Sequence, residues 1–148
     1  MLLTGTHPRT LDDKKRMVLP KRVREQLPDV QQLFVTPGAD QTLWLYDRPG
    51  LEALAAKLDQ TPATDSEARV FRRLFFAQME EVDVDGQGRI LIPDRLVQFA
   101  GLEREVVLLG VRDHLEIWNA AKWQEYFVQH GPRFDSVAES AFEKRDGS

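Results

Sequence analysis

Short apolar runs separated by polar turns occur twice along the chain in the same arrangement. Three consecutive apolar residues at 17–19, and three more at 90–92, are each long enough for a short buried strand. A proline follows each run, and a helix can begin there because proline lacks an N–H that the first helical turn leaves unbonded. The helices expected on this basis are 20–27, ended by Leu27-Pro28, and 93–100, ended by Ala100-Gly101.

Two more apolar segments follow each expected helix, and turn-forming residues separate them. The links at 37–40 and 111–113 have turn chemistry, so each pair of segments is expected to form a hairpin. Asp47 and Asn119 then stand where N-caps are needed for the helices that come next. The expected strands are 33–36, 42–46, 106–110 and 114–118, and the expected helices are 49–58 and 120–129.

Aligning the two arrangements reveals an internal repeat with a constant offset between 11–23 and 84–96. The three positions before each proline are apolar in both copies, and the later strands align more loosely. Two units are too few and too long for a solenoid, so we expect a pseudo-symmetric pair that shares one core. The recurrent polar positions are Asp12 and Asp85, Arg16 and Arg89, Pro20 and Pro93, and Arg22 and Arg95.

The repeat divides the chain into four expected segments: a first unit at 1–60, a connection at 61–79, a second unit at 80–130 and a tail at 131–148. The connection begins with a linker that ends in N-cap residues and continues as a helix with an apolar face. The tail is expected to be a weakly amphipathic helix with a frayed polar end. The apolar face around Phe71, Phe75 and Phe76 suits either the core or an interface between subunits, and the sequence leaves both open.

Composition narrows the class of protein. The chain has 148 residues, of which 42% are hydrophobic and 30% charged, as in ordinary globular domains. The absence of cysteine excludes disulfide frameworks, Cys-ligated metals and thiol nucleophiles. No apolar run is long enough for a membrane span, and the N-terminal segment does not resemble a signal peptide. We therefore expect a cytoplasmic protein without a membrane partner.

Charge is distributed unevenly between the two units. The net charge is −4, yet residues 9–24 hold seven Lys and Arg against two Asp, whereas the matching residues 82–97 hold two Arg against three Asp. A single basic patch at the first turn is the footprint of a surface that contacts nucleic-acid phosphates, although such a cluster can also be solvated surface. Asp12 and Asp85 each precede an arginine by four residues, a spacing that favours a turn-stabilising ion pair.

No catalytic, metal or cofactor constellation is evident. The three histidines are isolated, and the acidic run at 81–85 lacks the terminal glutamate of a calcium loop. Gly86-Gln87-Gly88 lacks the third glycine of a dinucleotide fingerprint. We therefore expect a non-enzymatic protein with no cofactor and no metal.

The two Asp-x-x-x-Arg turns, each leading through a proline into a short helix, resemble the MraZ family of bacterial transcriptional regulators over nearly the whole chain. The resemblance implies a mainly β fold with peripheral helices, built as a swapped-hairpin (double-split) β-barrel from two AbrB-like pseudo-repeats. It also implies a homo-oligomer that forms a closed ring, association with the nucleoid, and binding to double-stranded DNA repeats in the promoter of the division and cell-wall operon. The DNA-binding residues carried over are Arg9, Lys14, Lys15, Arg16, Arg22 and Arg89.

The first turn departs from the family pattern at one position. The family places glycine before the arginine, and Gly88 fits, but Lys15 stands there in the first unit. Either Lys15 adopts a positive φ, at a cost of about 1 kcal/mol, or the turn has another geometry. Because a fold does not determine function, an antitoxin-like or partner-protein-binding module on the same barrel is the alternative, followed by a ring that serves as a scaffold.

Overall fold

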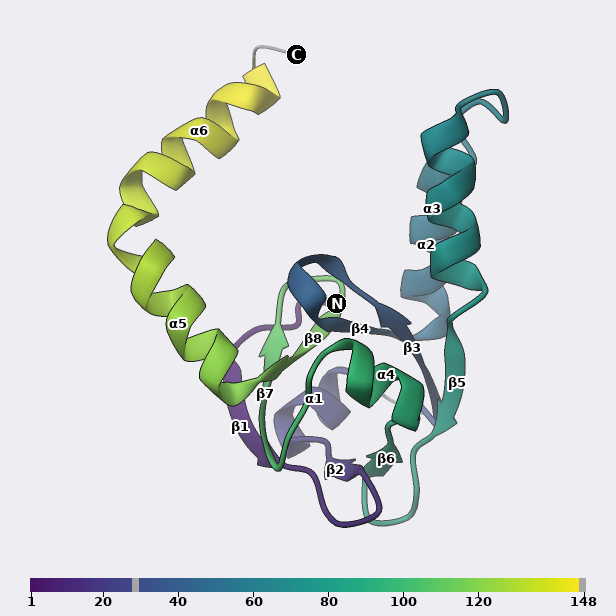
Figure 1. The fold of residues 1–148 in the computed structure, drawn as a ribbon, viewed down its shortest axis with the longest axis vertical. Helices are drawn as coiled ribbons and strands as arrows, with labels where there is room; N and C mark the ends of the chain where they lie inside the picture. Colours follow the sequence, from purple (N-terminus) through teal and green to yellow (C-terminus); the bar gives the residue numbers. More distant parts are fainter. Residues whose placement is uncertain (28–29, 147–148) are drawn as a thin grey trace.

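The computed structural model describes residues 1–27 and 30–146, which form an antiparallel sheet, a short two-stranded ladder and peripheral helices (Figure 1). The ladder pairs β2 (Arg16–Val18) with β6 (Arg89–Leu91). The six strands of the sheet, in spatial order, are β1 (Thr6–Thr10), β7 (Glu105–Gly110), β8 (Leu115–Asn119), β4 (Leu43–Tyr46), β3 (Gln32–Pro37) and β5 (Glu80–Asp83).

The strands of the two repeats are interleaved. β1 of the first repeat pairs with β7 of the second, and β5 of the second pairs with β3 of the first. β4 and β8 join the two hairpins at the centre of the sheet, and β2 pairs with β6. The mainly antiparallel fold predicted from the sequence is therefore present. Strand pairing among the described residues leaves β1 and β5 as the ends of the sheet, so a closed swapped-hairpin barrel is not established.

One core is shared by both repeats, as the internal repeat predicts. Met17 and Leu45 from the first repeat are packed in the same cluster as Ile90 and Ile117 from the second, and all four are almost completely buried. Each fully buried aliphatic side chain of this size contributes roughly 1.5–3 kcal/mol to stability relative to an exposed one. Neither repeat encloses this cluster alone.

The two short helices begin one residue later than predicted. α1 (Lys21–Gln26) and α4 (Asp94–Phe99) are each preceded by a proline with extended ψ, 144° at Pro20 and 140° at Pro93. The prolines therefore occupy N-cap positions rather than the first helical position. α1 ends at Leu27, and the predicted stop at Pro28 lies outside the described residues.

The longer helices are capped as predicted. Asp47 Oδ1 accepts a hydrogen bond from the Gly50 N–H at 2.8 Å at the start of α2 (Arg48–Leu58). Asn119 Oδ1 accepts from the Ala121 and Lys122 N–H groups at 2.9 and 3.1 Å at the start of α5 (Ala120–His130). The connecting helix, α3 (Ser66–Phe76), is capped by Asp65.

Helices form two arms that leave the sheet on opposite sides (Figure 1). One arm consists of α2 and α3. The other consists of α5, a short 3₁₀ turn η2 (Gly131–Arg133) and α6 (Phe134–Asp146). A further 3₁₀ turn, η1 (Ala39–Gln41), links β3 to β4. The tail is thus helical as predicted up to residue 146, and residues 147–148 lie outside the described part of the chain.

Candidate nucleic-acid interface

The first Asp-x-x-x-Arg segment forms a tight turn organised by one carboxylate. Asp12 Oδ1 accepts hydrogen bonds from the N–H groups of Lys14 and Arg16, at 2.9 and 2.8 Å. Asp12 Oδ2 accepts from Arg16 Nε at 2.7 Å. The Lys15 N–H also donates to the Asp12 carbonyl at 2.9 Å. One side chain therefore fixes both the backbone of the turn and the orientation of Arg16.

The second turn repeats this construction. Asp85 Oδ1 accepts from the N–H groups of Gln87 and Arg89, both at 2.9 Å, and Asp85 Oδ2 accepts from Arg89 Nε at 2.8 Å. The Gly88 N–H donates to the Asp85 carbonyl at 2.9 Å. The two turns thus share one hydrogen-bond pattern although their sequences differ in charge.

Lys15 adopts the backbone conformation that glycine favours. Its φ is 64°, beside 77° at Gly88, so a different geometry for the first turn is excluded. The Lys15 carbonyl accepts a hydrogen bond from the Ile92 N–H at 2.9 Å, and the Gly88 carbonyl accepts from the Leu19 N–H at 2.8 Å. Each turn is therefore held in place by a residue of the other repeat.

The β2–β6 ladder presents a mixed cationic and apolar outer face. The middle residue of each strand is buried, so the flanking residues point outward because side chains alternate along a strand. Arg16 is paired with Leu91, and Val18 is paired with Arg89. Val18 is 46% exposed and Leu91 is 51% exposed. Two arginines, each pinned by an aspartate, therefore alternate with two exposed aliphatic residues on this face.

The remaining predicted residues lie at different distances from this face. Arg9 lies on β1, and its Nε donates to the Val18 carbonyl at 3.0 Å, which places it beside the ladder. Lys14 is exposed in the first turn. Arg22 is exposed on α1, and no hydrogen bond or ion pair with a described residue joins it to the ladder. Its repeat equivalent, Arg95, instead bonds to Glu80 Oε1 at 3.0 Å.

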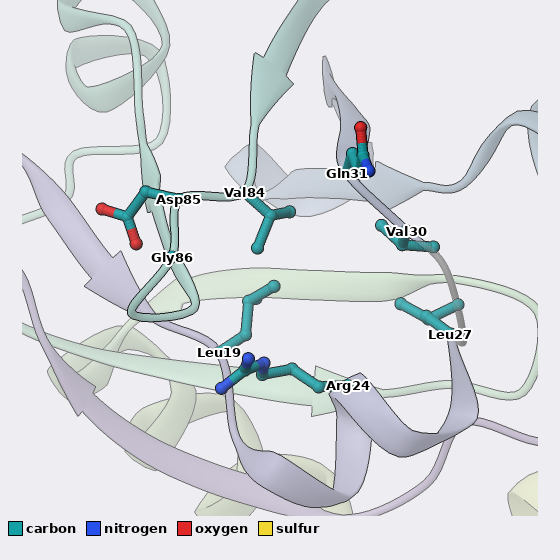
Figure 2. A pocket seen from close by; sticks show the side chains of 8 residues that line it. All are labelled: Leu19, Arg24, Leu27, Val30, Gln31, Val84, Asp85 and Gly86. Atoms are coloured by element: carbon teal, nitrogen blue, oxygen red, sulfur yellow. The ribbon is translucent and has the colours of Figure 1, made fainter.

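Arg24 is a cation at the site that the motif analysis did not select. Its side chain reaches from α1 toward the loop that carries Asp85 and Gly86, and it lines a cavity of about 340 Å³ there (Figure 2). The guanidinium covers Gly88 so closely that a Cβ on Gly88 would lie 2.6 Å from Arg24 Nη1. Arg24 thus brings a cation of the first repeat to the turn of the acidic repeat.

Both turn aspartates are held in the ionised form. The hydrogen bond from the Arg16 N–H is the main cause that lowers the pKa of Asp12 below its ordinary value, and the Arg16 side chain adds to the effect. The Arg89 N–H and side chain lower the pKa of Asp85 in the same way. At neutral pH each turn therefore contains a charge-assisted Asp–Arg pair.

The remaining chemistry of the described chain is sparse. Its Asp, Glu and His side chains include no group of three arranged to hold a metal ion. Across the same residues, none of the helices combines the length and the apolar character required to cross a bilayer.

Comparison with known proteins agrees with the resemblance seen in the turns. A family model described as "MraZ protein, putative antitoxin-like" matches twice, over residues 2–74 and 75–145. The Transcriptional regulator MraZ of Moorella thermoacetica is 37% identical over 138 residues, covering 93% of this chain and 95% of the relative. That of Saccharopolyspora erythraea is 42% identical over 129 residues, covering 87% and 89%. That of Acetivibrio thermocellus is 39% identical over 135 residues, covering 91% and 93%. Both repeats and nearly the whole length are therefore matched, and the chain belongs to the MraZ family.

Proposed function

We propose that this protein is a transcriptional regulator that binds double-stranded DNA through the β2–β6 ladder and the basic first turn. The observation that carries the proposal is the outer face of the ladder, where Arg16 and Arg89 are fixed by aspartates. A two-stranded antiparallel ribbon fits the major groove of B-DNA, which is about 12 Å wide. Relatives named as transcriptional regulators support this function.

The cations divide into two groups by their attachment. Arg16 and Arg89 each use Nε to hold an aspartate, which leaves the terminal guanidinium N–H groups to donate elsewhere. Such oriented groups suit bidentate contacts to a base edge or a phosphate. Lys14 and Lys15 project from the turn without this orientation and suit phosphate contacts, which carry little sequence information. Arg9 and Arg22 extend the phosphate-binding surface on either side.

The acidic remainder of the molecule is compatible with DNA binding because it lies elsewhere. The turns are at one end of the molecule, and the free ends of both helical arms are at the other (Figure 1). The negative net charge therefore opposes DNA weakly at the ladder, because repulsion between exposed charges is screened beyond about 10 Å at moderate salt. The local excess of cations dominates at the contact surface.

In the full proposal, two AbrB-like units at 1–60 and 80–130, joined by 61–79 and followed by 131–148, complete a swapped-hairpin barrel. The protein acts in the cytoplasm, on the nucleoid, as a closed homo-oligomeric ring without catalytic activity. One basic turn per protomer is a weak site, but a ring places several turns opposite repeated promoter elements. Affinity then comes from several simultaneous contacts. The repeats lie upstream of the division and cell-wall operon.

A DNA-binding assay with the upstream region of the gene tests the proposal. We expect discrete complexes that weaken with salt and disappear when the repeated elements are scrambled. Lys14→Ala plus Arg16→Ala should abolish binding, whereas the salt dependence of any residual binding should fall by about one counterion per lost phosphate contact. Two Asp12 Oδ1 bonds to backbone N–H groups remain in this variant, so the turn is retained.

A matched control removes two exposed lysines of the helical arms, by Lys57→Ala plus Lys122→Ala. This control should bind DNA as the wild type does. Wild-type affinity in the turn variant would refute the assignment of the site. Binding that ignores scrambling would refute sequence-specific regulation, and capture of a protein ligand by the same surface would instead favour the antitoxin-like alternative.

A further inference from the structure

The two helical arms expose apolar side chains on opposite sides of the molecule (Figure 1). Exposed apolar side chains gathered on one element are uncommon on monomers and mark interaction surfaces. We define the α3 face as Arg69, Val70, Phe71, Arg73 and Leu74, and the α6 face as Phe134, Asp135, Ala138, Glu139, Phe142 and Glu143. Among these, Phe134 is 74% exposed, Phe142 is 67% exposed and Leu74 is 58% exposed.

The α3 face is continuous with an apolar cavity of about 250 Å³. Phe71, Leu74 and Phe75 line it together with Trp44 and Phe99. Phe75 is 2% exposed and belongs to the packed interior, whereas Phe71 is 40% exposed. The structure therefore separates the residues that the sequence left undivided between core and interface. The cavity is large enough to receive an apolar side chain from outside.

The charges beside the two faces are of opposite sign. Asp135, Glu139 and Glu143 follow one another at four-residue spacing, which places them on one stripe of α6. All three are exposed, and none forms an ion pair with a described residue. On α3, Arg69 and Arg73 occupy an equivalent stripe. Arg73 is exposed without an ion pair in the described chain, and Arg69 bonds only to the neutral carbonyl of Ala63, at 2.7 Å.

Charge decides between the ways in which these faces could be covered. Two α6 faces brought together would oppose acidic stripes, and two α3 faces would oppose arginines. Within one molecule the arms lie on opposite sides of the sheet and cannot meet (Figure 1). The α6 face of one copy is therefore complementary to the α3 face of a second copy.

We propose that the α6 face docks on the α3 face of the neighbouring copy, with an α6 phenylalanine at the apolar cavity and the acidic stripe beside Arg69 and Arg73. The contact is head-to-tail, because two different surfaces meet. Such contacts repeat around a closed ring when the rotation between copies closes. The inference thus rests on the proposed ring and names the surfaces that build it.

Two charge reversals and their combination test this interface. The acid-reversed variant is Glu139→Arg plus Glu143→Arg, and the base-reversed variant is Arg69→Glu plus Arg73→Glu. Mass is measured by light scattering after size-exclusion chromatography. Each variant alone should fall from the oligomer mass of the wild type toward the 17.0 kDa monomer, because each opposes like charges across the contact.

Combining the reversals should restore assembly. A chain with all four changes, or an equimolar mixture of the two variants, again places opposite charges across every α6–α3 contact. Recovery of the oligomer mass also excludes misfolding as the cause of dispersal. A matched control, Glu25→Arg plus Glu103→Arg, reverses two exposed acidic residues outside the arms and should retain the wild-type mass.

Three outcomes would overturn the inference: a monomeric wild type, unchanged mass in both reversed variants, or no recovery when the reversals are combined. The proposed function fails separately. Dispersed variants keep the ladder intact, so they should still bind one DNA element at low salt but lose the gain from repeated elements. Absence of DNA binding by an intact oligomer would refute the proposed function and leave this interface standing.

Discussion

Lys15 is the residue of the first turn whose backbone conformation is least favourable. A side chain with positive φ costs about 1 kcal/mol relative to glycine, and the second repeat avoids that cost with Gly88. Hydrogen bonds at both its N–H and its carbonyl hold Lys15 in this conformation. The residue nevertheless adds a cation to the proposed DNA surface. Stability is thus lowered where charge is gained, as is common at functional sites.

Lys15→Gly is predicted to stabilise the protein and weaken DNA binding. The free energy of unfolding should rise by about 1 kcal/mol because the strain is removed. Affinity for DNA should fall because a phosphate contact is lost. Chemical denaturation and a binding titration measure the two effects on the same preparation.

Lys14→Gly is the matched control, since Lys14 is not among the residues with positive φ. It should lower both stability and DNA affinity. A stability gain in the control, or none in Lys15→Gly, would show that strain at Lys15 is not the cause.

At the scale of elements, each turn depends on an ionised aspartate. The depressed pKa of Asp85 means that its stabilising contribution is present above about pH 4, the ordinary range for an unfolded aspartate, and is lost as the pH falls through the lower folded-state value. Asp85→Asn should therefore lower stability at pH 7, because Arg89 loses its charged partner. The difference from the wild type should shrink as the pH is lowered, in urea unfolding series.

Asp13→Asn provides the comparison, because Asp13 is an exposed turn residue with no hydrogen bond to a described residue. Its stability should be insensitive to the change. Equal pH dependence in the two variants would contradict the role assigned to Asp85.

Elements with strong local signals could be predicted from the sequence, and edge strands could not. The caps Asp47 and Asn119 and both hairpins follow from local chemistry, so their positions were correct. β1 contains no aliphatic side chain and has Pro8 in its middle, and β5 is mostly acidic. Such strands occur at sheet ends, where one side needs no partner, so apolar periodicity does not reveal them.

The candidate site was predictable only as far as its motif reaches. The Asp-x-x-x-Arg spacing identifies the two pinned arginines because four residues span one tight turn. Arg24 meets Gly88 across the boundary between the repeats, and no local pattern encodes that contact. The apolar residues Val18 and Leu91 read as core in the sequence, but the ladder is too short to cover both faces.

At the scale of the whole molecule, the interleaved sheet makes folding a joint property of both repeats. Residues 1–74 alone lack β7, β8 and β6, which pair with β1, β4 and β2. We predict that this fragment does not fold as a monomer and that mixing it with residues 75–148 restores native structure. Circular dichroism and sedimentation measure folding and mass together. A cooperatively folded monomer of residues 1–74 would disprove the prediction.

Joining the two repeats in one chain also gives the ladder a direction. A pair of identical units would present β2 and β6 with exact two-fold symmetry, and a ligand lying across them would have two equivalent orientations. Here Lys14 and Lys15 at one end correspond to Gln87 and Gly88 at the other. The two ends therefore share one backbone geometry but differ in charge. A non-palindromic DNA element can be bound in a single orientation as a result.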